Sequence, residues 1–136
     1  MALPPGLFPL PPPSLLAQLR IWIGQGRRVA ERWAQVYRSL EDVHPDAPHW
    51  YLSLLGVDPA HQGRGLGRSL LESWLRSVDR EAAASYLETD REQNLAFYRR
   101  AGFDVRAEIR VLGIDVWCMW RPPRPAASAA IARRST

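Results

Sequence analysis

One stretch decides the fold of this chain: Val57-Asp58-Pro59-Ala60-His61-Gln62-Gly63-Arg64-Gly65-Leu66-Gly67. The apolar run before it, residues 50–57, predicts a buried strand, and leucines at helical spacing after it predict a helix over 66–78. Its alternating glycines let the backbone approach a ligand without a Cβ atom in the way. A helix that starts here directs free N–H groups and its positive dipole end at the same place. We therefore expect an anion-binding loop suited to a pyrophosphate.

The spacing of the glycines distinguishes this loop from two better-known phosphate loops. The dinucleotide fingerprint reads G-x-G-x-x-G, whereas this loop reads G-x-G-x-G. The Walker loop requires a lysine, and all 18 basic residues of the chain are arginines. A glycine-rich turn between strand and helix that binds nothing is the structural alternative.

Two motifs resemble the same family. Gln62-Gly63-Arg64-Gly65-Leu66-Gly67 resembles the Q/R-x-x-G-x-G/A loop of the GCN5-related N-acetyltransferases (GNAT family), and residues 94–103, NLAFYRRAGF, resemble the family's N-x-x-[FA]-Y-x-x-x-G-F pattern. Because two separate motifs occur in the right order, the chain is identified as a member of that family. The resemblance implies an α/β (α+β) acyl-CoA N-acyltransferase fold, in which helices flank a mixed central sheet.

The resemblance also implies a cofactor site. In the family, the loop amides hold the pyrophosphate of acetyl-coenzyme A, and the pantetheine arm lies in a gap where a bulged strand, here expected at Gly56, separates from its parallel neighbour. Carried over to this sequence, the expected cofactor-binding residues are Leu55, Val57, Gln62, Gly63, Arg64, Gly65, Leu66, Gly67, Arg68, Asn94 and Tyr98. For Arg64 and Arg68 a solvated side chain is an equal alternative to a phosphate contact.

Acetyl transfer to an amine needs a proton donor for the departing thiolate and a base for the amine. The resemblance places Tyr98 beside the thioester sulfur, where a phenol can donate that proton. Lysine-acetylating members carry a glutamate base at the position of Tyr51, so the base must lie elsewhere. Glu88, at the end of the strand expected over 84–88, is our candidate; His49 and a chain of waters are the alternatives. Cys118 is expected to be a buried structural thiol.

The chain divides into four predicted segments: a Pro-rich leader over 1–13, a helical segment over 14–44, the acetyl-CoA-binding core over 45–122 and a disordered basic tail over 123–136. The helical segment starts at Ser14 as N-cap and contains a second amphipathic run from Val29 to Leu40. The family opens with further strands and helices that have no counterpart here. We therefore expect an N-terminally truncated fold whose exposed sheet edge favours a homodimer.

Within the core, local patterns predict a short helix over 94–100 and two antiparallel strands over 103–110 and 116–120. The formal net charge of +4 comes from arginines scattered among acidic residues, so a nucleic-acid partner is not expected. One cysteine excludes an internal disulfide framework, and no metal-binding or membrane-spanning pattern is present in the sequence. We expect a cytoplasmic enzyme that transfers acetyl from acetyl-CoA to a small primary amine; an inactive or regulatory CoA-binding domain is the alternative.

Overall fold

The computed structural model describes residues 1–6, 14, 16, 23–24 and 26–124. Most of the first predicted helix, between Ser14 and Ile23, lies outside the described residues. So do nearly all of the predicted basic tail and most of the Pro-rich leader.

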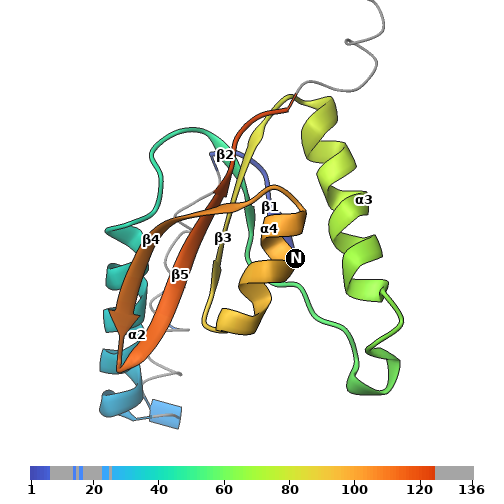
Figure 1. Cartoon of the computed structure of the whole chain (residues 1–136). Helices are drawn as coiled ribbons and strands as arrows, with labels where there is room; N and C mark the ends of the chain where they lie inside the picture. The colour runs from blue at the N-terminus through green and yellow to red at the C-terminus, as the bar shows by residue number, and fades with distance from the viewer. Residues whose placement is uncertain (7–13, 15, 17–22, 25, 125–136) are drawn as a thin grey trace, which may run out of the picture.

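The structure is built on a five-stranded mixed sheet with the strand order β1-β2-β3-β5-β4 (Figure 1). Its strands are β1 (Ala2–Leu3), β2 (His49–Leu52), β3 (Ala84–Thr89), β4 (Asp104–Val111) and β5 (Ile114–Arg121). Strands β2 and β3 are parallel, and every other neighbouring pair is antiparallel. The mixed sheet that the family resemblance implies is confirmed.

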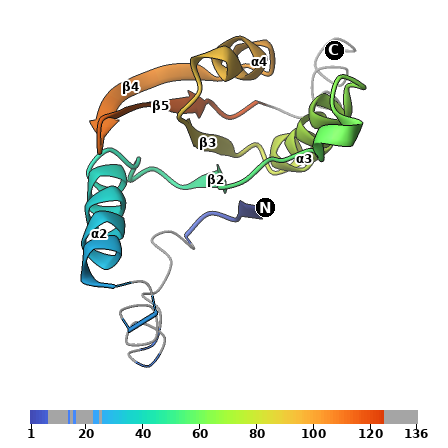
Figure 2. The same ribbon diagram turned by 90° about the horizontal axis from the view of Figure 1, so that it is seen from below.

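The helices α2 (Arg27–Glu41), α3 (Leu66–Arg80) and α4 (Leu95–Arg100) accompany the sheet. Single turns of 3-10 helix, η1 (Pro59–His61) and η2 (Glu92–Asn94), precede α3 and α4. Helix α4 packs on one face of the sheet and α2 lies on the other, while α3 connects the parallel strands on the α4 side (Figure 2). The core between the sheet, α3 and α4 comprises Leu52, Leu71, Leu75, Leu87, Leu95, Tyr98, Phe103 and Met119.

The strand predicted over 50–57 is only half right. Strand β2 ends at Leu52, and its pairing with β3 ends where Tyr51 lies opposite Tyr86. The following residues run outside the sheet, and Leu54 is exposed. An apolar run does not by itself distinguish a strand from an apolar segment that leaves the sheet. Because β3 continues to Thr89, the two parallel strands separate at this point.

Gly56 does not form the expected bulge, because it lies beyond the end of β2. The register shift in the described part of the sheet lies instead between Val105 and Ala107 of β4. Residues 112 and 113 join β4 to β5, and Leu112 and Gly113 both have positive φ angles, 52° and 86°. Positive φ at both central residues characterises the type I′ hairpin turn. The antiparallel hairpin predicted for this end of the chain is confirmed.

Arg121 is buried at the end of the sheet. It is the last residue of β5 and is 3% exposed. Its guanidinium donates to both carboxylate oxygens of Asp79 on α3, at 2.7 and 2.9 Å, and to the carbonyl oxygen of Ala101. Arg121 therefore joins the C-terminal end of α3 to the sheet and to the end of α4.

The start of the Pro-rich leader also belongs to the sheet. Ala2 and Leu3 pair with Leu52 and Tyr51 in antiparallel fashion. Within the described residues, no helix combines the length and the apolar character needed to cross a bilayer.

Candidate active site

The glycine loop between β2 and α3 is organised by its first residues. Asp58 caps η1, because its carboxylate accepts a hydrogen bond from the amide of Ala60 at 2.8 Å. The side chain of Gln62 donates to the carbonyl oxygen of Val57 at 3.0 Å. Gln62 therefore closes the loop on itself, and its side-chain nitrogen is already bonded within the protein.

The backbone amides that follow Gln62 are not hydrogen-bonded within the described part of the chain. The amides of residues 63–68 donate to no acceptor within the described part of the chain, and the first bond of α3 runs from the Ser69 amide to the Gly65 carbonyl. Gly63 and Gly65 both have φ of +75°, which an L side chain rarely adopts, and a Cβ built on either meets no atom within 4 Å. The loop therefore combines open space, unbonded amide donors and the start of a helix, and together these features suit the binding of a pyrophosphate.

The two arginines of the loop differ in their surroundings. Arg68 is ion-paired with Glu72 one turn along α3, with 2.7 Å between Nε and Oε1. Arg64 makes no hydrogen bond or ion pair with any residue that the structure describes. Of the two, Arg64 is the one whose guanidinium needs no rearrangement to meet a phosphate.

The separation of β2 from β3 creates the second part of the site. Leu55 packs against the core, and its amide makes no bond to the described residues, whereas the carbonyl of Val57 is occupied by Gln62. Continuing the register of Tyr51 and Tyr86 by two residues would place residue 53 opposite Glu88, but the chain has already left the sheet there. Glu88 therefore lies two residues beyond Tyr86, the last residue of β3 that pairs with β2.

Tyr98 and Asn94 lie on the α3 and α4 side of this gap. Tyr98 is 9% exposed and belongs to the core together with Leu52 and Leu87. Burial raises the pKa of its phenol, so the hydroxyl keeps its proton. The side-chain amide of Asn94 donates to Thr89 Oγ1 at the end of β3, at 3.2 Å.

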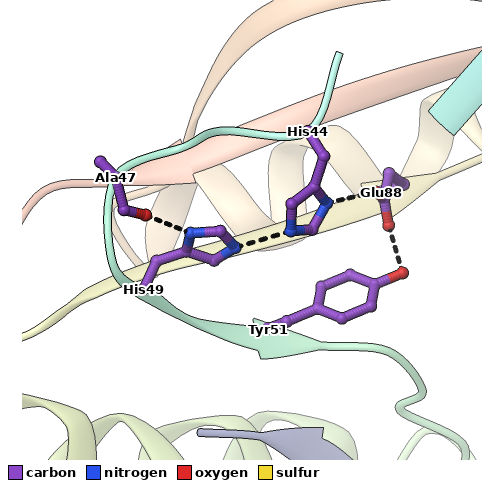
Figure 3. Close-up of polar contacts among 5 residues, drawn as sticks. All are labelled: His44, Ala47, His49, Tyr51 and Glu88. Atoms are coloured by element: carbon purple, nitrogen blue, oxygen red, sulfur yellow. Dashed lines mark hydrogen bonds and ion pairs between the residues drawn. The ribbon is translucent and has the colours of Figure 1, made fainter. Parts of the chain in front are cut away.

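Glu88 lies on the opposite face of the sheet, where Figure 3 shows it among side chains of β2 and of the preceding turn. Tyr51 donates its hydroxyl proton to Glu88 Oε2 at 2.7 Å, and His44 Nδ1 lies 3.8 Å from Glu88 Oε1. Both His44 and Glu88 side chains are nearly buried, at 7% and 10% exposure. Burial and the neighbouring Glu88 raise the pKa of Tyr51, which keeps this donor protonated.

A pair of histidines completes this cluster. His49 Nδ1 is 2.7 Å from the carbonyl oxygen of Ala47, and His49 Nε2 is 3.0 Å from His44 Nε2 (Figure 3). Burial is the largest cause lowering the pKa of His49, so this ring is neutral near pH 7. His49, an alternative base in the sequence analysis, is the first residue of β2. The sequence analysis did not single out His44, because nothing local relates His44 to Glu88.

Two hollows lie on the two faces of the sheet. A pocket of about 350 Å³ opens over the histidine face and is lined by His44, His49 and Tyr51, together with prolines of the turn and of the N-terminus. A larger groove of about 540 Å³ runs between α3 and α4 and is lined by Arg68, Arg76, Phe97, Arg100 and Arg121 among others. Neither Glu88 nor Tyr98 lines this second groove.

Cys118 on β5 is buried, and burial raises the pKa of its thiol. The expectation of a structural thiol is confirmed. No group of His, Cys, Asp and Glu side chains within the described part of the chain could hold a metal ion.

The chain resembles known acetyltransferases in sequence and in structure. It is 44% identical over 73 residues to the N-alpha-acetyltransferase RimI of Mycobacterium tuberculosis, covering 49% of this chain and 45% of that one. It is 34% identical over 114 residues to a mycothiol acetyltransferase of Propionibacterium freudenreichii, covering 82% of this chain and 32% of that one. The chain thus spans less than half the length of these relatives.

Among solved structures, the chain is similar to the crystal structure of histone acetyltransferase HPA2 and related acetyltransferase from Corynebacterium glutamicum. That match has a TM-score of 0.55 and 30% sequence identity, and covers 60% of this chain and 45% of the other. The family model for the acetyltransferase (GNAT) domain matches residues 17–105. The chain therefore belongs to the GNAT acetyltransferase family.

Proposed function

We propose that the protein is an N-acetyltransferase, which transfers an acetyl group from acetyl-CoA to a primary amine of a small molecule by direct attack in a ternary complex. The observation that carries this proposal is the run of backbone amides at residues 63–68, which have no acceptor within the described chain and stand at the start of α3. The first amides of any helix lack an intrahelical acceptor; here the amides of Gly63 and Arg64 add to them, and the space above Gly63 and Gly65 is open.

The residues around the loop fit the cofactor. The amides of residues 63–68 and the guanidinium of Arg64 would hold its pyrophosphate, and the amide of Leu55 would pair with the pantetheine arm where β2 leaves the sheet. Arg68 would join them only by giving up Glu72. Asn94 would meet the arm from the α4 side, through the amide atoms that Thr89 leaves available. Bound there, the thioester supplies an activated acetyl group.

Two titratable side chains then accept and donate the protons of the reaction. Glu88, whose carboxylate is nearly buried on the histidine face, accepts a proton from the incoming amine. Tyr98 offers a proton from the other face, and burial keeps its phenol protonated throughout the neutral range. Because donor and acceptor approach from opposite faces of the sheet, the two substrates can occupy the gap together.

The nature of the acceptor rests on the relatives and on the pocket. The mycothiol acetyltransferases carry the name of a small-molecule substrate. The pocket of about 350 Å³ lined by His44 and Tyr51, which both contact Glu88, suits a small amine. The N-alpha-acetyltransferase relative, at 44% identity, favours a second candidate, the α-amine of a peptide.

A free-thiol assay with acetyl-CoA, a panel of small primary amines and a panel of short peptides tests the proposal. We expect release of free CoA that depends on the amine, and small amines to outperform peptides. Faster turnover with peptides would favour the second candidate. Binding of CoA without turnover on any amine would instead identify an inactive or regulatory CoA-binding domain.

Two further expectations accompany this function. The one cysteine is buried and free, which suits the cytoplasm, because small extracellular domains rely on disulfides. Strand β1 pairs only with Tyr51 and Leu52, so within the described residues half of the β2 edge, at His49 and Trp50, is left for pairing with a second copy, and a homodimer through this edge is proposed. Sedimentation analysis at micromolar concentration distinguishes dimer from monomer.

A further inference from the structure

The hydrogen bonds around His44 and His49 fix where their protons are. A carbonyl oxygen only accepts, so the contact with Ala47 requires His49 Nδ1 to carry the hydrogen. Burial lowers the pKa of His49 and keeps the ring neutral, which leaves His49 Nε2 as an acceptor. The contact between the two Nε2 atoms therefore requires His44 Nε2 to donate. In neutral His44, the unprotonated nitrogen is then Nδ1, which faces Glu88.

In this arrangement one proton can be bound between His44 and Glu88. His44 Nδ1 and Glu88 Oε1 are both acceptors in this state and stand 3.8 Å apart, at ion-pair distance. Tyr51 occupies the other carboxylate oxygen as a donor. A proton that reaches His44 Nδ1 turns the ring into an imidazolium at ion-pair distance from the Glu88 carboxylate.

The proposed reaction produces one such proton. An amine that enters as an ammonium ion loses one proton to become a nucleophile, and a second when the new C–N bond forms and the C–S bond breaks. The thiolate takes up one of the two, so each turnover releases one proton overall. The protein must receive that proton near the attacking nitrogen and pass it to water.

We propose that His44 is the residue that receives this proton from Glu88, and that His49 positions it by fixing which of its nitrogens faces the carboxylate. Glu88 takes the proton from the ammonium, passes it to His44 Nδ1 and returns to the carboxylate form. His44 lines the pocket of about 350 Å³ and so can release the proton to solvent there. The inference rests on the proposed function. It adds a proton-accepting role for His44 and a positioning role for His49.

The groups around His44 come from several elements. Glu88 and Tyr86 reach it from β3, His49 and Tyr51 from β2, with ring centroids of His44 and Tyr86 4.8 Å apart. Farther out, the rings of Trp120 on β5 and His49 lie 5.5 Å apart. Cys118 neighbours Tyr86, and the phenol of Tyr37 on α2 contributes to raising the pKa of Tyr51. Burial raises the pKa values of Tyr51, Tyr86 and Cys118, so near neutral pH these groups are uncharged. The carboxylate of Glu88 lies at ion-pair distance from the His44 ring.

The first test uses the wild-type protein without substrate. The chain has three histidines, so long-range ¹H–¹⁵N spectra of the imidazoles can be assigned with the two variants His61→Asn and His49→Asn. We expect His49 to carry its hydrogen on Nδ1 and His44 on Nε2 at neutral pH. A His49 that is protonated on Nε2, or an imidazolium at pH 7, would overturn the inference.

The second test compares wild type with His44→Asn across the pH range. Without the imidazole, a carboxyl group alone must take the proton, and carboxyl groups titrate below imidazoles. We expect the acid limb of kcat/KM to move to lower pH by about one unit or more and kcat to fall about 10- to 100-fold. The KM for acetyl-CoA should stay within twofold. His49→Asn should lower kcat less, because His44 is kept.

The outcomes separate this inference from the function on which it rests. Asp115→Asn, which changes an exposed carboxylate of the β4–β5 hairpin, is the matched control and should leave the pH profile unchanged. A wild type that acetylates amines with an acid limb that His44→Asn does not move would refute the inference alone. A wild type that binds CoA but acetylates nothing would refute both.

Discussion

The ion pair between Asp79 and Arg121 holds the C-terminal end of α3, and replacing Asp79 by Asn tests its worth. The variant keeps the shape of the side chain but removes the charge opposite a guanidinium that is 97% buried, since Arg121 is 3% exposed. Removal of one partner from a buried ion pair typically costs about 3–5 kcal/mol. The Asp79 side chain is 28% exposed, so water replaces part of the interaction, and we expect a loss of about 2–3 kcal/mol.

Glu72→Gln is the matched control on the same helix. It breaks the ion pair with Arg68, whose side chains are 77% and 49% exposed, and should cost about 0.5 kcal/mol or less. Urea unfolding followed by tryptophan fluorescence measures both variants, and a difference in the midpoints at equal slope gives the change in unfolding free energy. Losses that agree within about 0.5 kcal/mol would refute a stabilising role for the buried pair.

Three other changes test the site and its surroundings. Tyr98→Phe should lower kcat about 10- to 100-fold while the Kd for acetyl-CoA stays within twofold; unchanged turnover would remove Tyr98 from the chemistry. Burial raises the pKa values of Tyr51, Tyr86 and Tyr98, so the folded state keeps protons that the unfolded chain loses near pH 10. Unfolding free energy should therefore fall above about pH 10, by up to about 1.4 kcal/mol per pH unit for each tyrosine, and a flat profile from pH 9 to 11 would contradict this. Gly65→Ala, at φ of +75°, should cost about 1–2 kcal/mol, whereas Gly67→Ala, whose Cβ would meet Val57 at an ordinary 3.6 Å, should cost nothing measurable; equal losses in urea would refute this assignment.

The parts of the fold that could be predicted are those encoded locally. Helix α3 is predicted by the glycines before it and by its apolar residues at helical spacing. Strand β4 is predicted by the alternation of its apolar and polar residues, and the burial of its residues alternates accordingly. The short helix before Gly102 follows from a motif with a glycine at a fixed offset, and Gly102 indeed has φ of +93°. In each case the residues that decide the structure lie within a few positions of one another.

The parts that could not be predicted depend on partners far along the chain. The early end of β2 is not visible in its apolar sequence, because it is set by where pairing with β3 stops. His44 and Glu88 come together across the sheet, and Arg121 meets Asp79 from a different element, so neither pairing leaves a local pattern. The roles of the predicted site residues stay predictions, although Gln62 is already bonded to Val57 and Arg68 to Glu72.

One titration tests the central claim, that the unsatisfied amides at the start of α3 bind the pyrophosphate of CoA. CoA is added to ¹⁵N-labelled protein, and the backbone amides of residues 63–68 are followed beside those of Leu112 and Gly113 in the distant hairpin. We expect saturable downfield shifts at 63–68 and none in the hairpin. Binding that leaves the amides of residues 63–68 unshifted, or no binding at millimolar CoA, would contradict the account.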